Sequence, residues 1–374
     1  MADTITPLTM PKFGLAMTEG KIASWNVQPG DTVDTGEEIV DIETTKITNG
    51  YESPIAGILR RQVAPEGETL PVGALIGVLA DKETNDTEID AFIAKFQSEF
   101  SSGAEEEEKD TESEPTIVEV GPLKLRVQTI GHGEETPILF IHGFGGDLTN
   151  WMLNQSSLAN NRRSISFDLP GHGGSTKDVG DGKTSNFATT TSGLLDALNI
   201  EKAHIVGHSL GGAIALRLAE AHPQKVASLT LIAPVGLEKE IDKSFIDGFV
   251  TADRRKTLEP VLQKLVADKA LISRNMVEGI IRFKRLDGAT KSLQTIAEAC
   301  FPDGQQVDDL RGILAGFNGP AQVIWGADDE ILSADGAKNL PDKVKVTIVA
   351  GTGHMPQLEK ASEVNALITN FIGK

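Results

Sequence analysis

A strand, a tight turn and a helix follow one another around Ser209. Residues Ala203–Val206 form a short apolar run typical of a buried strand, and Ala213–Ala219 are rich in strong helix formers. Between them stands Gly-x-Ser-x-Gly, with Gly207 and Gly211 on either side of the serine. In this context the spacing predicts a nucleophile elbow, a turn so tight that neighbouring side chains would clash. A glycine-rich turn with a chance serine is the alternative, because the short motif alone is a weak signal.

A nucleophilic serine needs a base, an acid that orients the base, and N–H groups that bind an oxyanion. His354 follows the apolar strand Val344–Val349 and lies among glycines, so it is the predicted base. Two adjacent carboxylates, Asp328 and Asp329, follow the strand Val323–Trp325 and compete for the role of the acid. The chain therefore offers serine, aspartate and histidine in that order.

Residues 142–146, His-Gly-Phe-Gly-Gly, are predicted to form the oxyanion site. They follow the apolar strand Ile138–Ile141, so the turn lies at the carboxyl end of a buried strand. The N–H of Phe144, together with the N–H of Leu210 beside the serine, is expected to bind an oxyanion.

Together these motifs resemble the α/β-hydrolase superfamily over about Thr116–Lys374. The order Ser, Asp, His is the order of that family's triads. The family spacing Trp-Gly-x-x-Asp selects Asp329 over Asp328, which leaves Asp328 as a turn-stabilising carboxylate. The resemblance implies a triad of Ser209, His354 and Asp329.

Apolar runs and helical stretches alternate through residues 116–374, which predicts a mostly parallel, doubly wound sheet. Residues from about 236 to 312 break this alternation and are largely helical in pattern. An insertion there matches the cap position of α/β-hydrolases and would cover Ser209, excluding water from the site. The expected strands lie near 138–141, 164–167, 203–206, 228–232, 321–325 and 344–349, after an alternating strand that starts near 121.

The first eighty residues contain an internal repeat. Residues 30–39 align with 67–76 without a gap at an offset of 37, and the same offset maps Gly20 onto Gly57 and Ile42 onto Leu79. Recurring turn glycines separate stretches with β-branched residues, so an all-β domain with quasi-two-fold symmetry is expected over 1–80.

Lys46 is expected on a turn at the end of this domain opposite its exit, because its symmetry mate is Glu83. The context Glu-Thr-Thr-Lys-Ile, with Met-Pro-Lys at 10–12 and Pro-Gly-Asp at 29–31, resembles the lipoyl domains of 2-oxo-acid dehydrogenase complexes. That resemblance implies a flattened β-barrel and lipoate bound covalently to Lys46. Thr45 replaces the aspartate of many lipoyl domains. Biotin carrier domains share the fold, but they usually place methionine on both sides of the lysine.

An acidic segment, 81–115, separates the two regions and is interpreted as a flexible linker. It carries thirteen acidic residues and three lysines. Five apolar residues recur within it at helical spacing and predict a short amphipathic helix. We expect this helix to pack on a neighbouring domain, and a docking helix for another subunit is the alternative. The five residues are Ile89, Phe92, Ile93, Phe96 and Phe100.

Composition limits the classes of partner and the cellular location that we expect. The formal charge of −19 argues against nucleic acid and against an anionic membrane surface as partners. The only cysteine, Cys300, excludes an internal disulfide framework and suits a reducing cytosol. No apolar run is long enough to span a bilayer and the start of the chain lacks a signal-peptide pattern, so we expect a cytoplasmic protein without a metal site.

The fusion of the two regions indicates the function. The His-x-x-x-Asp-Gly motif of the usual acyltransferase core is absent from the sequence. A lipoyl domain joined to a serine α/β-hydrolase module resembles the acetyltransferase component of acetoin-cleaving dehydrogenase complexes. The resemblance implies acetyl transfer from dihydrolipoyl-Lys46 to coenzyme A. It also implies a thiamin-diphosphate-dependent acetoin dehydrogenase component and dihydrolipoamide dehydrogenase as partners, and a homo-oligomer.

Two other functions stay open at this point. A thioesterase or carboxylester hydrolase would use the same triad with water as the acceptor. A non-enzymatic lipoyl carrier with a degenerate hydrolase scaffold is the third, and the intact set of Ser209, Asp329 and His354 counts against it.

Overall fold

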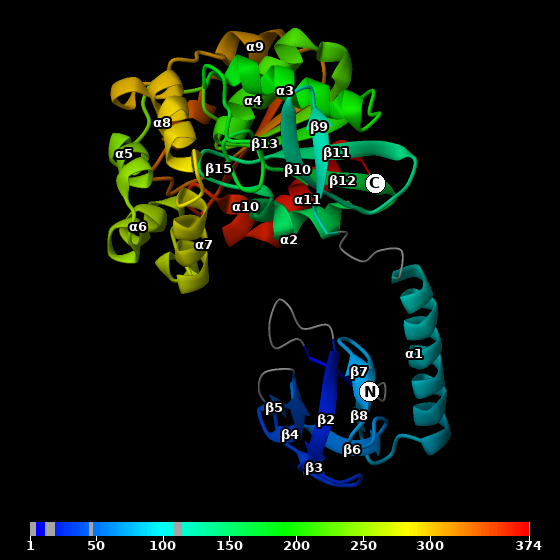
Figure 1. Cartoon of the computed structure of the whole chain (residues 1–374). Coiled ribbons are helices and arrows are strands. Elements are labelled where there is room, and N and C mark those ends of the chain that lie inside the picture. The colour runs from blue at the N-terminus through cyan, green and yellow to red at the C-terminus, as the bar shows by residue number, and fades with distance from the viewer. Residues whose placement is uncertain (1–4, 12–18, 45–47, 108–113, 374) are drawn as a thin grey trace. The chain divides into compact units, whose positions relative to one another are not determined.

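Figure 1 shows the computed structural model of the chain, which describes residues 5–11, 19–44, 48–107 and 114–373. The chain divides into two compact units, Met1–Thr111 and Glu112–Lys374. Each unit is described by itself below. Among the described residues, no helix combines the length and the hydropathy that crossing a membrane requires.

The N-terminal unit contains two four-stranded sheets, ordered β1-β8-β6-β3 and β5-β4-β2-β7. The predicted all-β domain is confirmed, and the offset of 37 reappears in the strand bounds, since it carries β4 onto β8 residue for residue. The strands are β1 (Thr6–Thr9), β2 (Glu19–Trp25), β3 (Thr32–Val33), β4 (Glu38–Glu43), β5 (Thr48–Glu52), β6 (Gly57–Gln62), β7 (Thr69–Pro71) and β8 (Leu75–Ala80).

Symmetry-related residues form the core of this unit. Ile39 and its mate Ile76 are both fully buried, as are Ile22 and its mate Leu59. The turns repeat as well: Gly30 and Gly67, one offset apart, have φ of 105° and 86°. Glycine adopts positive φ without steric cost, so both copies of the turn need it.

The strands β4 and β5 pair antiparallel as far as Glu43 opposite Thr48. The intervening residues therefore join two paired strands of the same sheet. Lys46 and its neighbours 45–47 lie outside the described residues. The placement of Lys46 stays a prediction, while the two paired strands that flank it are part of the structure.

The helix predicted within the acidic segment spans Asp86–Glu107 (α1), longer than the apolar positions alone suggest. Ile89 is buried against β8, and Phe92, Ile93 and Phe96 pack beside it. Arg61 forms ion pairs with Asp86 and Asp90 of the helix, at 3.3 and 3.2 Å. The expected packing on a neighbouring domain is confirmed. Much of the segment interpreted as a linker is thus helical, and the mobility of residues 81–115 stays a prediction.

The C-terminal unit is built on one eight-stranded sheet, ordered β16-β15-β14-β13-β11-β12-β10-β9. The strands β11 to β16 run parallel to one another, whereas β9 and β10 add an antiparallel edge. The strands are β9 (Thr116–Val120), β10 (Leu123–Ile130), β11 (Glu135–Ile141), β12 (Arg162–Phe167), β13 (Ala203–His208), β14 (Val226–Ile232), β15 (Ala321–Gly326) and β16 (Val344–Val349).

Helices cover both faces of this sheet, and β11 shows how the pleat divides them. Leu139 and Ile141 belong to the core beneath α3 and α4, while Ile138 and Phe140 belong to the core beneath α11. These runs are continuously apolar because both faces are buried. The helices outside the cap are α2 (Met152–Gln155), α3 (Thr184–Ala197), α4 (Leu210–Ala221), α9 (Arg311–Gly316), α10 (Pro356–Glu359) and α11 (Ala361–Ile372).

Four helices between β14 and β15 form the predicted cap (Figure 1). They are α5 (Lys243–Thr251), α6 (Arg255–Leu262), α7 (Arg274–Lys284) and α8 (Ala289–Cys300). Short 3-10 turns complete the unit at Leu148–Trp151, Ser156–Leu158, Pro223–Lys225, Gln263–Leu265, Lys269–Leu271, Pro302–Gly304 and Ala334–Ala337. The fold class expected from the sequence is confirmed.

Candidate active site

Ser209 occupies the turn between β13 and α4, where its φ is 53°. A Cβ added at Gly207 would lie 2.4 Å from the carbonyl oxygen of Gly211. A Cβ added at Gly211 would lie 2.1 Å from the carbonyl oxygen of Ile141. Real Cβ atoms do not approach backbone that closely, so both glycines are required by sterics. The strained φ and the two glycines together make the predicted nucleophile elbow.

His354 and Asp329 come together from loops that follow β16 and β15. The Nδ1–H of His354 donates to Oδ2 of Asp329 at 2.8 Å, and both side chains are almost completely buried. Because the carboxylate accepts the Nδ1 proton, Nε2 is the nitrogen left to act as a base. The structure thus forms the acid–base half of the predicted triad.

Four hydrogen bonds fix the Asp329 carboxylate. Besides His354, it accepts from the indole N–H of Trp325 at 3.0 Å and from the N–H groups of Ile331 and Leu332 at 2.8 and 3.0 Å. Burial by itself would raise the pKa of Asp329, but the imidazole and these donors outweigh it and hold the pKa below its usual value. The carboxylate therefore stays ionised. Asp328, by contrast, is exposed to solvent.

His208 links His354 to the elbow. Its Nε2–H donates to the backbone oxygen of His354 at 2.8 Å, and the two ring centroids are 4.8 Å apart. Since His208 directly precedes Ser209, this contact ties the loop of the predicted base to the predicted elbow. Among the described residues, the Ser209 hydroxyl has no hydrogen-bond partner, His354 included. Catalytic hydrogen bonds are often long in free enzymes and tighten when substrate binds.

The predicted oxyanion donors are available. In the part of the chain that the structure describes, the N–H groups of Phe144 and Leu210 have no acceptor. Leu210 is the first residue of α4, so its N–H is one of those that a helix leaves unpaired at its N-terminus. Two free N–H groups beside a nucleophile are what an oxyanion site needs.

Two histidines hold the loop that contains Phe144. His142 Nε2 accepts from the N–H of Leu169 at 2.9 Å, and His172 Nε2 accepts from the N–H of Gly145 at 3.1 Å. In each ring Nδ1 donates to a backbone carbonyl. Burial lowers the pKa of both histidines, so both stay neutral and keep one acceptor nitrogen. Both histidines therefore act as hydrogen-bonding groups that hold the loop.

An aromatic cluster from the cap covers the site. The Phe144 ring lies 5.7 Å from Phe249 of α5 and 6.1 Å from Phe301 at the end of α8, measured between ring centroids. A Cβ at Gly145 would lie 2.3 Å from the Phe249 ring. With Ser209 only 5% exposed, the cap excludes water from the nucleophile.

Comparison with known proteins agrees with both units. The family described as "alpha/beta hydrolase fold" matches residues 136–361, and the family described as "Biotin-requiring enzyme" matches residues 6–79. The chain is 44% identical, over 99% of each sequence, to the "dihydrolipoyllysine-residue acetyltransferase component of acetoin cleaving system" of Pseudomonas putida. The component of the same description from Cupriavidus necator is 40% identical over 100% of this chain and 99% of its own length. This chain belongs to that family of acetyltransferase components.

Solved structures support the fold of the second unit of this acetyltransferase component. A meta-cleavage product hydrolase from Pseudomonas fluorescens aligns with a TM-score of 0.62 at 21% identity, covering 68% of this chain and 96% of its own. At this identity the likeness shows the α/β-hydrolase fold alone.

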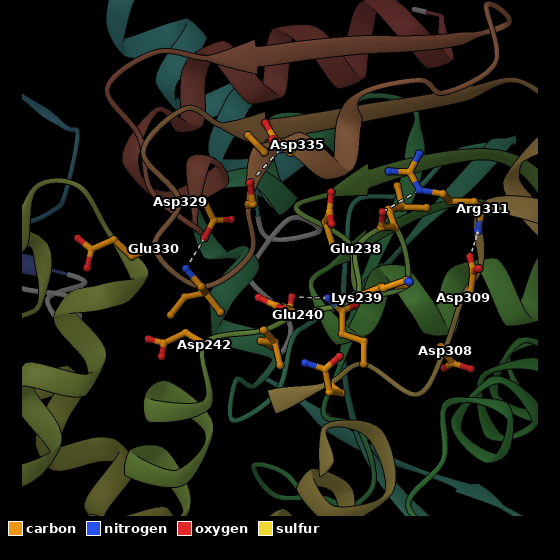
Figure 2. A pocket seen from close by; sticks show the side chains of 18 of the residues that line it. Glu238, Lys239, Glu240, Asp242, Asp308, Asp309, Arg311, Asp329, Glu330 and Asp335 are labelled. Atoms are coloured by element: carbon orange, nitrogen blue, oxygen red, sulfur yellow. Dashed lines mark hydrogen bonds between the residues drawn. The ribbon is translucent and has the colours of Figure 1, made fainter. Parts of the chain in front are cut away.

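A large acidic pocket of the acetyltransferase component is not lined by the predicted nucleophile. It has a volume of about 1050 Å³ and is lined by Asp329 but not by Ser209 or His354. Its wall carries eight carboxylates and two cationic side chains, most of which are labelled in Figure 2. The pocket shares only Asp329 with the predicted triad, and the Asp329 carboxylate is itself buried.

Sequence analysis missed three contributors to the site. Trp325 donates a hydrogen bond to Asp329. The signal for it in the sequence is the tryptophan of the spacing Trp-Gly-x-x-Asp. Asp168 is fully buried and accepts from the N–H groups of Leu148 and Gly174 at 2.8 and 2.6 Å, which ties together loops near the oxyanion turn. Phe249 covers the oxyanion turn, and no motif pointed to it because its role depends on the packing of the cap.

Proposed function

We propose that this protein transfers an acetyl group from dihydrolipoyl-lysine to coenzyme A within an acetoin cleaving system. The observation that supports this most is the identity of 44% and 40% to two such components over the whole chain, both units included. A lipoyl-type unit and a serine–histidine–aspartate site in one chain provide a carrier and a transferase together.

Lys46 is the proposed attachment point of lipoate. It lies between β4 and β5, whose pairing as far as Glu43 and Thr48 leaves a connection of only four residues. A short connection between two paired strands of a two-sheet scaffold suits an amide-linked arm. When bound, the lipoyl group supplies a thiol that holds the acetyl group as a thioester.

In the first half of the reaction, Ser209 attacks the acetyl carbonyl. His354 Nε2 takes the proton from Oγ as the new C–O bond forms, and the N–H groups of Phe144 and Leu210 bind the oxyanion. The C–S bond then breaks, and His354 returns the proton to the departing sulfur. Asp329 stabilises the imidazolium throughout. The acetyl group is left on Ser209.

In the second half, the same groups act in reverse. His354 takes the proton from the thiol of coenzyme A, and the sulfur attacks the acetyl-serine carbonyl. The oxyanion forms again at the N–H groups of Phe144 and Leu210. The C–O bond breaks, and Ser209 recovers its proton from His354. A route without the covalent step would have His354 activate the thiol directly and leave Ser209 as an oxyanion donor.

A thiamin-diphosphate-dependent acetoin dehydrogenase component and dihydrolipoamide dehydrogenase are the proposed partners, because acetyl must be loaded onto the arm and the arm reoxidised. We further propose a homo-oligomer in the cytoplasm. Copurification of the native complex from cells grown on acetoin, with identification of its subunits, tests the partners.

The acceptor distinguishes this function from hydrolysis. The lipoylated full chain is incubated with acetyl-dihydrolipoamide, with and without coenzyme A, and the products are identified by mass spectrometry. We expect acetyl-coenzyme A to form and little free acetate without the acceptor, because the cap excludes water. Acetate produced at the same rate in both samples would identify a thioesterase instead.

Lys46→Arg tests the carrier site separately. The variant should carry no lipoyl adduct by intact mass after expression with a lipoate ligase, and it should still transfer acetyl from free acetyl-dihydrolipoamide. An adduct that persists on the variant would show that another lysine is modified.

A further inference from the structure

The outer surface of the cap concentrates positive charge in a chain whose net charge is −19. Two pockets of about 350 and 390 Å³ adjoin there, sharing Asp253, Arg254, Ile281 and Arg285. The acidic residues in their walls are Asp253 and Glu278. The cationic residues in their walls are Arg254, Arg255, Arg282, Lys284 and Arg285.

Three of these arginines have guanidinium N–H groups that form no hydrogen bond within the described residues. Arg282 and Arg285 are exposed, and among the described residues their guanidinium groups form no hydrogen bond or ion pair. Arg254 reaches only its neighbour in sequence, Asp253, at 3.8 Å. We call Arg254, Arg282 and Arg285 the cap arginine cluster.

The other charges at the pockets are already paired. Arg255 Nε donates to Glu259 at 2.9 Å, and Glu278 accepts from Arg274 Nε at 2.6 Å. Arg274 is the main partner of Glu278, and Arg255 and Arg282 interact with the same carboxylate more weakly. With Asp253 beside Arg254, the pocket walls hold five cationic and two acidic residues, so an excess of positive charge remains.

The acidic pocket of Figure 2 has the opposite character. Its wall holds eight carboxylates and two cations, Lys239 and Arg311. Five of the carboxylates are paired with cations or with His354 outside the wall, and the three that are not, Glu238, Glu240 and Asp309, still outnumber the two cations. Coenzyme A carries several negative charges on its pyrophosphate and 3′-phosphate, so this pocket repels it. Of the pockets described here, those at the cap arginine cluster are the ones with a cationic excess that suits such a ligand.

The cap arginine cluster also lies close to the acyl site. The Lys284 ammonium lines one of the pockets, donates to the backbone oxygens of Phe249 and Ala252, and lies 5.6 Å from the centroid of the Phe249 ring. The Phe249 ring also contacts Phe144, and the two ring centroids are 5.7 Å apart. The N–H of Phe144 belongs to the predicted oxyanion site. A single aromatic side chain thus connects the pocket with the oxyanion loop.

We propose that the cap arginine cluster binds the phosphate groups of coenzyme A, and that the thiol arm passes Phe249 to reach Ser209. This rests on the proposed function. Guanidinium groups match phosphate oxygens with paired hydrogen bonds, which an isolated ammonium does not. The phosphates stay on the cap surface while the uncharged pantetheine arm enters the covered site, so no phosphate needs to be buried.

The test replaces the cluster by Arg254→Gln, Arg282→Gln and Arg285→Gln in one full-length protein. We expect KM for coenzyme A to rise roughly 20-fold, because three partly exposed charged contacts are lost, with kcat at saturating acceptor unchanged. Pantetheine as the acceptor lacks the phosphates, so its kinetic constants should match those of the wild type. Lys256→Gln is the matched control, since it removes one exposed charge from the cap helix α6 outside both pockets, and KM should not change.

Calorimetric titration with coenzyme A tests this proposal independently of the proposed acetyl transfer. Weaker binding by the triple variant, with normal binding by Lys256→Gln, supports the site even if no acetyl transfer occurs. An unchanged KM and affinity for coenzyme A in the triple variant would overturn it. Equal losses with pantetheine and coenzyme A would also overturn it, because the cluster would then serve the fold or the acyl donor, for example the acidic lipoyl unit.

Discussion

The two units of this chain differ in where they place polar and strained residues. All seven histidines lie in the C-terminal unit, and four of them are buried, whereas the first 111 residues contain none. Non-glycine residues with positive φ, Ser209 among them, are likewise confined to the C-terminal unit within the described residues. In the N-terminal unit the recurring positive φ angles fall on glycines such as Gly30 and Gly67.

This difference separates a carrier from a catalyst. The β-unit repeats one pattern twice and buries matched apolar residues, and among its described residues positive φ angles fall only on glycines. The hydrolase unit holds Ser209 in a strained turn and buries ionisable rings, and the surrounding loops must stabilise both. The predicted catalytic residues therefore lie in the unit that holds strained backbone and buried ionisable side chains.

The largest effect that this comparison predicts comes from Ser209→Ala. With acetyl-dihydrolipoamide and coenzyme A as substrates, the rate should fall on the order of 10⁶-fold, as for other serine triads. His354→Ala should be equally severe. Lipoylation of the β-unit should be normal in both variants, as measured by intact mass. A loss of only about 10²–10³-fold for Ser209→Ala, without a trapped acetyl-serine, would favour direct transfer to the thiol.

Asp329→Asn should reduce the rate on the order of 10⁴-fold, because the amide leaves His354 in the wrong tautomer. The matched control is Asp328→Asn, one residue away and exposed, for which we expect little change. The measurement is kcat under saturating substrates. Equal defects in the two variants would contradict the assignment of the acid.

Mild acid should destabilise the C-terminal unit selectively. Burial lowers the pKa of His208 to about 3, so the unfolded chain, with a histidine pKa near 6.5, binds the proton more readily. Stability from this group is complete above pH 6.5 and is lost as the pH falls toward the folded pKa. Between pH 6.5 and 5.5 His208 alone should cost about 1 kcal/mol, and His142 and His172 act in the same direction.

Hydrogen exchange on the full chain, read by mass spectrometry at pH 6.5 and 5.5 with correction for the intrinsic rate, follows both units at once. Protection should fall in β13 and β14 and stay constant in β4 and β8. A parallel loss in both units would contradict a histidine origin, because the β-unit has no histidine.

The smallest expected effect tests the symmetry of the β-unit. Ile39→Val and Ile76→Val remove one methylene from fully buried, symmetry-related positions, so each should lower the free energy of unfolding by about 1 kcal/mol. Urea unfolding of the two variants gives the comparison. A difference of more than about 1 kcal/mol between them would show that the two halves are not equivalent in packing.

Local patterns predicted most of the fold because each depends on neighbours in sequence. The offset of 37 between Ile39 and Ile76 predicted a symmetric β-unit, and apolar runs predicted the strands of the C-terminal sheet. The length of α1 was underestimated, because its apolar positions end at Phe100 while the helix continues through residues 101–103, which are poor helix formers, to Glu107. The nucleophile elbow was predictable for the same local reason, since Gly207 and Gly211 are needed by a turn of five residues.

The sequence alone determined which residue types the site would contain and on which kinds of elements they would lie. Only the tertiary structure decided how they meet: that Asp329 is buried under Trp325 while Asp328 faces solvent, that His208 brings His354 to the elbow, and that Phe249 closes the cap over Phe144. The cap arginine cluster belongs to this second group, because it joins a turn near Arg254 with the end of α7. Contacts between residues far apart in the chain depend on how whole elements pack, and no local pattern encodes that packing.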